Sequence, residues 1–170
     1  MREASGALFN TEAIISVDAE LIKTIKQRAA EAPRGRFRLC LHHSTADPVQ
    51  EMIIAHTRAS YTQPHRQDAS KLYVMIEGEL LVVIFDELGA VSRQITLKPG
   101  THPTPCCLRI APGWWHTTIA LSDVAVVCEV LGRANPAGQA SEYAEWAPAE
   151  NDPKAVAAYL RQLDVTAEPR

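Results

Sequence analysis

Two stretches of this chain are the most informative about its fold. They are PHRQDASKLYVMIEG, residues 64–78, and APGWWH, residues 111–116. In the first, His65 opens a polar run, an apolar strand pattern follows, and Gly78 turns the chain. In the second, a Pro-Gly turn leads to His116 at the start of another strand pattern. Each stretch therefore predicts a histidine beside a β-strand.

Further strand patterns lie on both sides of these stretches. The complete set covers residues 36–41, 49–57, 61–65, 71–76, 79–85, 91–97, 108–111, 117–121 and 125–131. Short strands at such regular spacing, with turn residues between them, predict an all-β sandwich, barrel or jelly roll.

Two helices are expected at the ends of the β region. Residues 18–32 have a helical apolar period, with Ser16 or Asp18 as the N-cap and Pro33 as the stop. Residues 153–163 form the second helical pattern, because a proline suits the first turn and the apolar side chains share one face.

The length of 170 residues is typical of one domain. We expect a single domain over residues 1–170, with a core barrel at about 36–131 and a helical extension at each end. Residues 1–10 and 132–148 show little pattern of either kind.

The charge balance argues against two classes of partner. With 17 basic and 20 acidic side chains, the formal charge is −3, which gives no reason to expect nucleic acid or an anionic membrane. No apolar run approaches the roughly 20 residues that cross a bilayer, and no signal peptide is visible. We expect a cytoplasmic protein, with its four cysteines as free thiols, that binds a small molecule.

The two histidines are the first candidates for chemistry. A barrel has a mouth lined by inward-facing strand residues, so His65 and His116 with a third ligand would hold a divalent ion there. Lys71 is a candidate base, since desolvation in such a pocket lowers the pKa of a lysine. The alternative is that Lys71 points outward or pairs with Asp68 or Glu77.

Other polar side chains fall on the same predicted faces. Tyr73 alternates with Lys71, so its hydroxyl would help to bind a ligand if Lys71 points inward. Arg38 and His42 alternate with apolar residues, which predicts either a pocket wall or a solvent-facing edge. His56 and His102 are expected to be structural or exposed.

The two stretches that open this section resemble the two-part layout of a cupin. That small β-barrel carries a metal on three histidines and one glutamate, and its first half reads His-x-His, three or four residues, Glu, six residues, Gly. In this chain the second histidine position is Gln67 and the glutamate position is Lys71. Glutamine is a weak neutral ligand, and a lysine ammonium opposes metal binding.

A larger part of the chain resembles the WbuC family of cupin-fold metalloproteins, found in bacterial surface-polysaccharide gene clusters. The matching segments are residues 36–42, 47–52, 64–66, 77–80, 82–87, 113–117 and 142–150. The resemblance implies a cupin double-stranded β-helix, or jelly roll, with an N-terminal and a C-terminal helix. It also implies a sugar-like ligand and a divalent metal of the Zn, Fe, Mn or Ni class on His65, Gln67 and His116.

The departures from the family concentrate at the pocket, at Cys40, Gln67, Lys71 and Leu131. The scaffold is kept and the ligand positions are changed, so we expect a small-molecule-binding protein of the WbuC type with a partly degenerate metal site. One alternative is a sugar or sugar-nucleotide isomerase or epimerase that uses Lys71 and His116 for acid–base chemistry. The other is a non-catalytic binding or dimerising scaffold, and in either case we expect a homodimer through the sheet edges.

Overall fold

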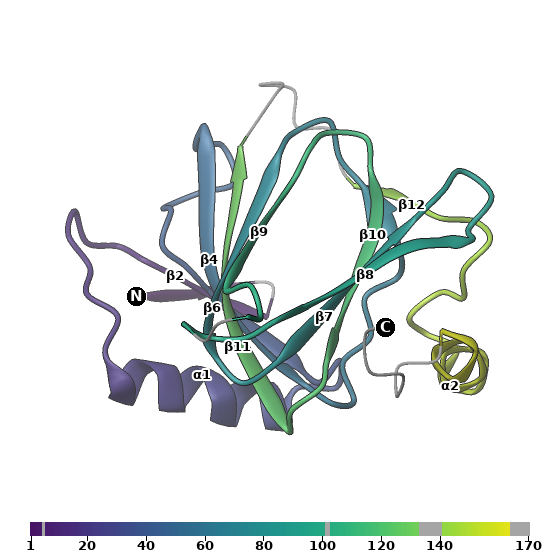
Figure 1. Ribbon diagram of the computed structural model, residues 1–170. Helices are drawn as coiled ribbons and strands as arrows, with labels where there is room; N and C mark the ends of the chain where they lie inside the picture. Colours follow the sequence, from purple (N-terminus) through teal and green to yellow (C-terminus); the bar gives the residue numbers. More distant parts are fainter. Residues whose placement is uncertain (5, 101–102, 133–140, 164–170) are drawn as a thin grey trace.

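The computed structural model describes residues 1–4, 6–100, 103–132 and 141–163. Two β-sheets face each other across the interior, and two helices lie outside them (Figure 1). The seven-stranded sheet has the order β1 (Arg2–Ala4), β2 (Ala7–Phe9), β3 (Arg36–Cys40), β4 (Val49–Thr57), β11 (Val124–Gly132), β6 (Lys71–Glu77), β9 (Cys107–Ile110). The five-stranded sheet has the order β12 (Glu142–Tyr143), β5 (His65–Arg66), β10 (Trp115–Ala120), β7 (Leu80–Phe85), β8 (Val91–Leu97). The predicted all-β jelly roll with a helix at each end is confirmed.

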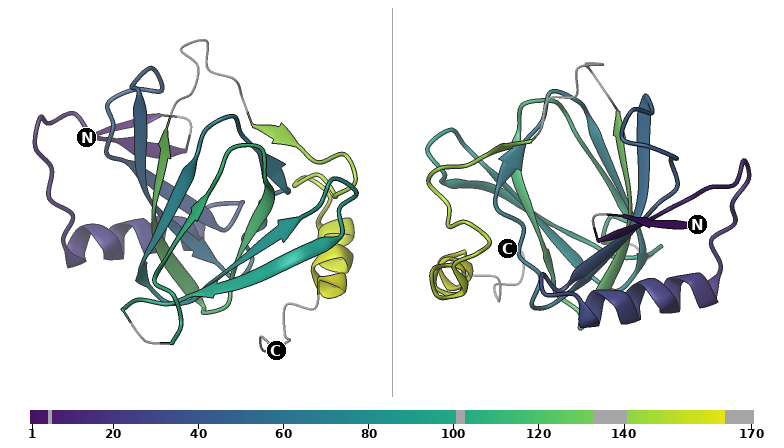
Figure 2. Two further views of the ribbon diagram at one scale, coloured as in Figure 1. Left: turned by 45° about the horizontal axis from the view of Figure 1, so that its top comes forward. Right: turned by 180° about the vertical axis from the view of Figure 1, so that it is seen from behind.

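Successive side chains of a strand point to opposite faces of its sheet, and apolar residues occur on both faces of β7. Leu80, Val82 and Ile84 of β7 point into the barrel, whereas Leu81 and Val83 point out. The outer face of the seven-stranded sheet packs against α1 (Ala19–Glu31), and that of the five-stranded sheet against α2 (Pro153–Gln162) and the segment before it. Figure 2 shows the two helices on opposite outer sides of the molecule.

Helix α1 begins and ends where the sequence predicts. The Asp18 side chain caps it by accepting the Leu21 N–H at 2.9 Å, so of the two expected caps Asp18 is the one used. Its apolar stripe of Ile22, Ile25 and Ala29 is buried against the sheet. None of the helices in the described part of the chain has the length and apolarity that crossing a membrane requires.

The turn between β6 and β7 depends on Gly78. Its φ is +73°, a left-handed conformation, and a Cβ at this position would lie 2.3 Å from the Ser122 hydroxyl oxygen and 2.4 Å from the Val124 carbonyl oxygen. Only glycine fits this close approach. The turn therefore fixes the register in which β6 delivers Lys71 and Tyr73 to the interior.

Three segments differ from the expectation. Residues 2–9, expected to lack pattern, form the β1–β2 hairpin, and β2 pairs in parallel with β3. Residues 142–143 form β12, which pairs with β5. The strand expected at residues 61–65 is confined to His65–Arg66. The pairings of β2 with β3 and of β12 with β5 join segments that are distant in the sequence, so a local pattern does not reveal them.

Candidate functional site

His65 and His116 stand directly opposite each other on the antiparallel strands β5 and β10. Their ring centroids are 4.5 Å apart, and both side chains are buried. Nδ1 of His65 lies 3.1 Å from the Gln63 carbonyl oxygen, and Nδ1 of His116 lies 3.0 Å from that of Trp114. Because a carbonyl oxygen only accepts, each Nδ1 carries the proton and each Nε2 presents a lone pair.

Lys71 points into the barrel and is 4% exposed, which excludes the outward alternative. Its amine donates to Nε2 of His65 at 3.1 Å and lies 3.7 Å from a carboxylate oxygen of Glu129 on β11. Burial lowers the pKa of Lys71, and the Glu129 carboxylate opposes that change. Glu77, one of the two partners that the alternative offered for Lys71, pairs instead with Lys26, at 2.6 Å.

Burial keeps both imidazoles in the neutral form. Burial, and after it the nearby Lys71, lower the pKa of His65 to about 3. The pKa of His116 also falls well below its usual 6.5, first through burial and then through Lys71 and His65. Nε2 of His116 is buried and has no hydrogen-bond partner among the described residues.

These residues do not fit a divalent metal ion. The Nε2 lone pair of His65 is already bonded to the Lys71 amine, and an ammonium group at this position opposes metal binding. The third predicted ligand, Gln67, is a neutral amide that donates to the Ser141 hydroxyl at 2.9 Å, and its own oxygen has no described partner. In the part of the chain that the structure describes, no three His, Cys, Asp or Glu side chains are grouped to hold an ion.

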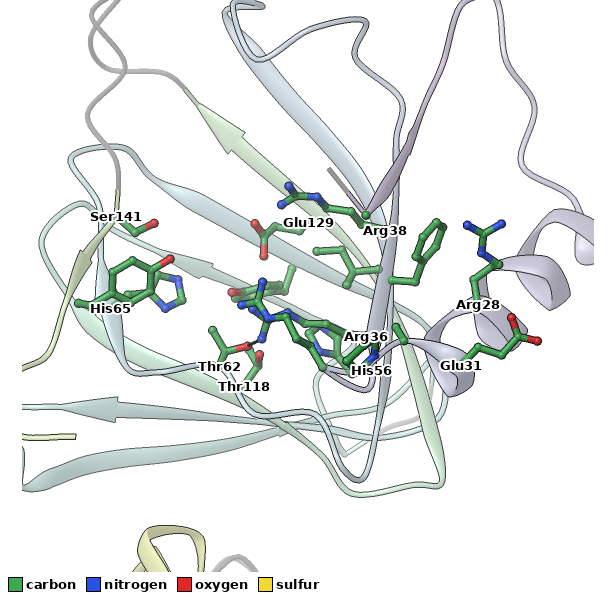
Figure 3. A pocket seen from close by; sticks show the side chains of 18 of the residues that line it. Arg28, Glu31, Arg36, Arg38, His56, Thr62, His65, Thr118, Glu129 and Ser141 are labelled. Atoms are coloured by element: carbon green, nitrogen blue, oxygen red, sulfur yellow. Dashed lines mark hydrogen bonds between the residues drawn. The ribbon is translucent and has the colours of Figure 1, made fainter. Parts of the chain in front are cut away.

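A cavity of about 590 Å³ opens beside this cluster. Figure 3 shows it extending from His65 and Ser141 past the arginines of β3 to Arg28 and Glu31 of α1. Residues from the barrel interior that line it are Ile54, His56, Thr62, His65, Gln67, Tyr73, Thr118 and Glu129. Lys71 and His116, the two predicted catalytic residues, are absent from this wall and contact it through His65 and Tyr73.

Four arginines line the cavity, Arg28, Arg34, Arg36 and Arg38, and the last two belong to β3. Arg36 and Arg38 alternate with Phe37 and Leu39, which pack under α1, although Phe37 also reaches the cavity. Arg36 donates to Thr62 at 2.7 Å and to Glu150 at 3.0 Å. The Arg38 side chain has no hydrogen bond or ion pair with any residue described here.

The predicted ligand-binding residues separate into two groups. Arg38 and Tyr73 line the cavity, and burial followed by the neighbouring Glu129 raises the pKa of Tyr73 well above 10.0. His42 is outside the cavity wall: strand β3 ends at Cys40, and the His42 ring packs edge-on against Phe9 with Nδ1 at the Glu51 backbone. The alternation that grouped His42 with Arg38 therefore stops before it reaches His42.

Three cavity residues escaped the sequence interpretation. Arg36 was visible only as part of the alternating face, and His56 was expected to be structural. Glu129 follows Ala125 and Val127 at spacings of two on β11, and a charged residue in such an apolar strand was the available signal. His102 lies outside the described residues.

Two comparisons concern the amino-acid sequence. Residues 17–97 match the model of a family described as a domain of unknown function, DUF6016, over slightly less than half of the chain. No curated protein matches the sequence.

Solved structures resemble the chain more broadly. An oxalate oxidase in complex with the substrate analogue glycolate is 17% identical, with a TM-score of 0.51 over 67% of this chain and 57% of that one. A protein of Shewanella oneidensis is 11% identical, with a TM-score of 0.50 over 59% of this chain and 69% of its own. A cupin superfamily protein of Desulfitobacterium hafniense is 15% identical, with a TM-score of 0.46 over 57% and 76%. This chain thus spans little more than half of the oxalate oxidase chain, and at these identities the likeness shows the fold alone, the cupin jelly roll.

Proposed function

We propose that this cupin-fold protein binds a small, negatively charged, hydroxyl-bearing molecule, of the acidic-sugar or sugar-phosphate class, without a metal ion. The observation that carries the proposal is Arg38, whose guanidinium lines the cavity without a carboxylate partner among the described residues. Guanidinium groups bind carboxylates and phosphates through paired, charge-assisted hydrogen bonds.

The neighbouring charges support an anionic ligand. Arg36 is already held by Glu150, and the Glu129 carboxylate lies 3.7 Å from the Lys71 amine. The other two arginines of the wall are also paired, Arg28 with Glu3 and Arg34 with Glu150. Arg38 is therefore the arginine of this wall that has no ion pair among the described residues. A cavity of about 590 Å³ lies within the usual range for small-molecule sites and has room for a monosaccharide with an acidic group.

Hydroxyl groups on the ligand would satisfy polar atoms that the fold leaves in the wall. The Gln67 side-chain oxygen is buried without a described partner and would accept a hydrogen bond from a ligand hydroxyl. Thr62 and Thr118 add hydroxyls that both donate and accept. The narrower proposal, a WbuC-type protein linked to surface-polysaccharide metabolism, is supported by the sequence resemblance and agrees with a sugar in this cavity.

Calorimetric binding of glucose, glucuronate and glucose 6-phosphate tests the proposal. The two anions should bind at least about tenfold more tightly than glucose, because an ion-paired hydrogen bond contributes about 1.5–3 kcal/mol. Arg38→Met should abolish that preference, and a chelator should leave binding unchanged. Arg58→Met is the matched control, since Arg58 is 64% exposed, pairs with Asp123 and is outside the cavity wall.

Two results would contradict anion binding in this cavity. One is equal affinity for glucose and glucose 6-phosphate. The other is an Arg38→Met variant that binds the anions as well as Arg58→Met does. Failure of all three compounds to bind would reject the acidic-sugar class.

A second candidate, a sugar isomerase or epimerase, is favoured by the contact between Lys71 and His65. His65 is in the cavity wall, and its Nε2 meets an amine whose pKa burial lowers, so the pair is arranged to move a proton. One member of the pair would act as the base and take the proton from a carbon beside the ligand carbonyl. Its conjugate acid would return a proton to that carbon or to the adjacent one. In D₂O, NMR should then show deuterium at C2 of glucose 6-phosphate, and His65→Gln should prevent it; no exchange with the parent protein would remove this candidate.

We also propose a homodimer. Strand β9 ends the seven-stranded sheet and β8 ends the five-stranded sheet, so each presents backbone groups that pairing would cover. Light scattering should give twice the mass of the chain, and a monomer mass would contradict the proposal.

A further inference from the structure

We propose that the Tyr143 ring is a stacking platform in the cavity wall and that the ligand lies on it as a closed sugar ring. The site would then select pyranoses over open-chain polyols that carry the same polar groups. This inference rests on the proposed function, because it names the form of the molecule that the cavity would take.

Tyr143 is the large aromatic residue of the described wall whose ring is partly open. Its exposed fraction is 51%, whereas Phe37 and Tyr73, the other two large aromatic residues of that wall, are buried. The surfaces of a buried ring are already in contact with the protein, so such a ring has no free face for a ligand. Tyr143 is therefore the residue of this wall that can offer an aromatic surface.

The backbone of β12 fixes the direction in which this ring points. Strand β12 pairs with β5, so that Glu142 stands opposite Arg66 and Tyr143 stands opposite His65. Glu142 accepts from Arg66 at 2.7 Å on one face of this ribbon, and Tyr143 points to the other face together with His65. The ring centroids of Tyr143 and His65 are 6.0 Å apart. The platform is thus in place before a ligand arrives, which reduces the entropy cost of binding.

Hydrogen-bonding groups adjoin the ring. Ser141 is two residues before Tyr143 in an extended segment, lines the same cavity, and accepts from the Gln67 amide at 2.9 Å. The Gln67 side-chain oxygen is buried without a described partner. Polar groups beside an aromatic surface suit a molecule that is apolar on its faces and polar around its edge.

A pyranose has this distribution of groups. Its C–H bonds lie on the two faces and are attracted to the negative face of an aromatic ring, while its hydroxyls project from the edge and would bond to Ser141 and Gln67. An open-chain polyol has no continuous C–H face and loses more rotational freedom on binding. Stacking on Tyr143 therefore distinguishes the two forms.

The position of Arg38 agrees with a ligand that spans the cavity. His65 and Ser141 lie at one end, and Arg38 lies further along toward α1 (Figure 3). A ring placed on Tyr143, beside His65, would direct an acidic substituent toward the Arg38 guanidinium. The two contacts together would favour a cyclic sugar that carries one acidic group.

Calorimetry with two matched pairs of compounds tests the inference: glucose 6-phosphate against sorbitol 6-phosphate, and glucose against sorbitol. Reduction at C1 opens the ring in each pair and leaves the other hydroxyls and the phosphate unchanged. The parent protein should bind each ring at least about fivefold more tightly than its open-chain counterpart. Tyr143→Ala should abolish this ratio, and Tyr143→Phe should keep it. Trp114→Ala is the matched control, since Trp114 is 52% exposed and outside the described cavity wall.

Three results would overturn the inference. The parent protein could bind rings and open chains equally. Tyr143→Ala could weaken both forms by the same factor, which would mean that the side chain only holds β12 in place. Tyr143→Phe could lose the ratio as well, which would assign the effect to the hydroxyl group and not to the ring face.

Failure of this inference and failure of the proposed function are distinguishable. Equal affinity for glucose and glucose 6-phosphate would reject anion binding through Arg38, and the ring preference would still be measured with glucose and sorbitol. Loss of the ring preference would leave the anion preference standing. Binding of none of the four compounds would reject both.

Discussion

The parent protein should lose stability when the pH falls from 7 to 5. In the His56→Gln variant this loss in the free energy of unfolding should be smaller by about 2 kcal/mol. The His56 ring is 5% exposed, near the cavity floor, and its Nδ1 lies 3.2 Å from the Ser60 hydroxyl oxygen. Burial, and after it the nearby Lys71, lower the pKa of His56 to about 4.

The sign follows from which state binds the proton. In the unfolded chain the pKa of His56 returns to its usual value of 6.5. Between pH 6.5 and about pH 4, His56 therefore binds a proton in the unfolded state and stays neutral in the folded state. Stability therefore falls as the pH drops through 6.5, and the His56 contribution stops changing below about pH 4. At pH 5 the difference amounts to roughly 2 kcal/mol relative to pH 7.

Urea unfolding followed by tryptophan fluorescence at pH 7 and pH 5 measures this difference. The comparison is between the pH-dependent losses of the parent protein and of His56→Gln, so the cost of the substitution itself cancels. His43→Gln is the matched control, because His43 is exposed, and it should retain the full loss. If His56→Gln loses as much stability on acidification as the parent, the buried neutral histidine is not the cause and the reasoning is refuted.

Two further substitutions test the scaffold by urea unfolding. Gly78→Ala should cost about 2–4 kcal/mol, since its Cβ would meet Ser122 and Val124 in a left-handed turn, and a loss below about 1 kcal/mol would mean that the turn relaxes freely. Asp18→Ala should cost about 1 kcal/mol through loss of the α1 cap on Leu21, while Asp18→Asn should be nearly neutral; equal losses in both would point to charge instead of capping.

The strands of the barrel could be predicted because their signals are local. An apolar run rich in Met, Ile and Ala defined Val49–Thr57 to the residue, the turn before Val91 preceded the strand Val91–Leu97, and a glycine turn separated β6 from β7. The β1–β2 hairpin escaped because three-residue strands carry too few residues to show a period. Ala7 and Phe9 become core residues only through their contact with the barrel.

The candidate site was predictable in part for the same reason. Histidines beside strands, and the alternation of Lys71 with Tyr73, are patterns within one segment, and the structure brings these residues together. The choice between an inward and an outward Lys71 was open. An alternating pattern shows which residues share a face of the strand, but it does not show which face is buried. The role of Glu129 at the amine depends on β11 pairing with β6, far away in the sequence.

Local sequence patterns were enough to predict a jelly roll with a helix at each end and two histidines beside its strands. They also revealed the substitutions, Gln67 and Lys71, that distinguish its pocket from the cupin layout it resembles. The contact of the Lys71 amine with His65 and the position of Arg38 in the cavity wall became known from the structure alone. The physical reason is that strand patterns are encoded by neighbours along the chain, whereas distances between charges depend on strands that pair across the whole barrel.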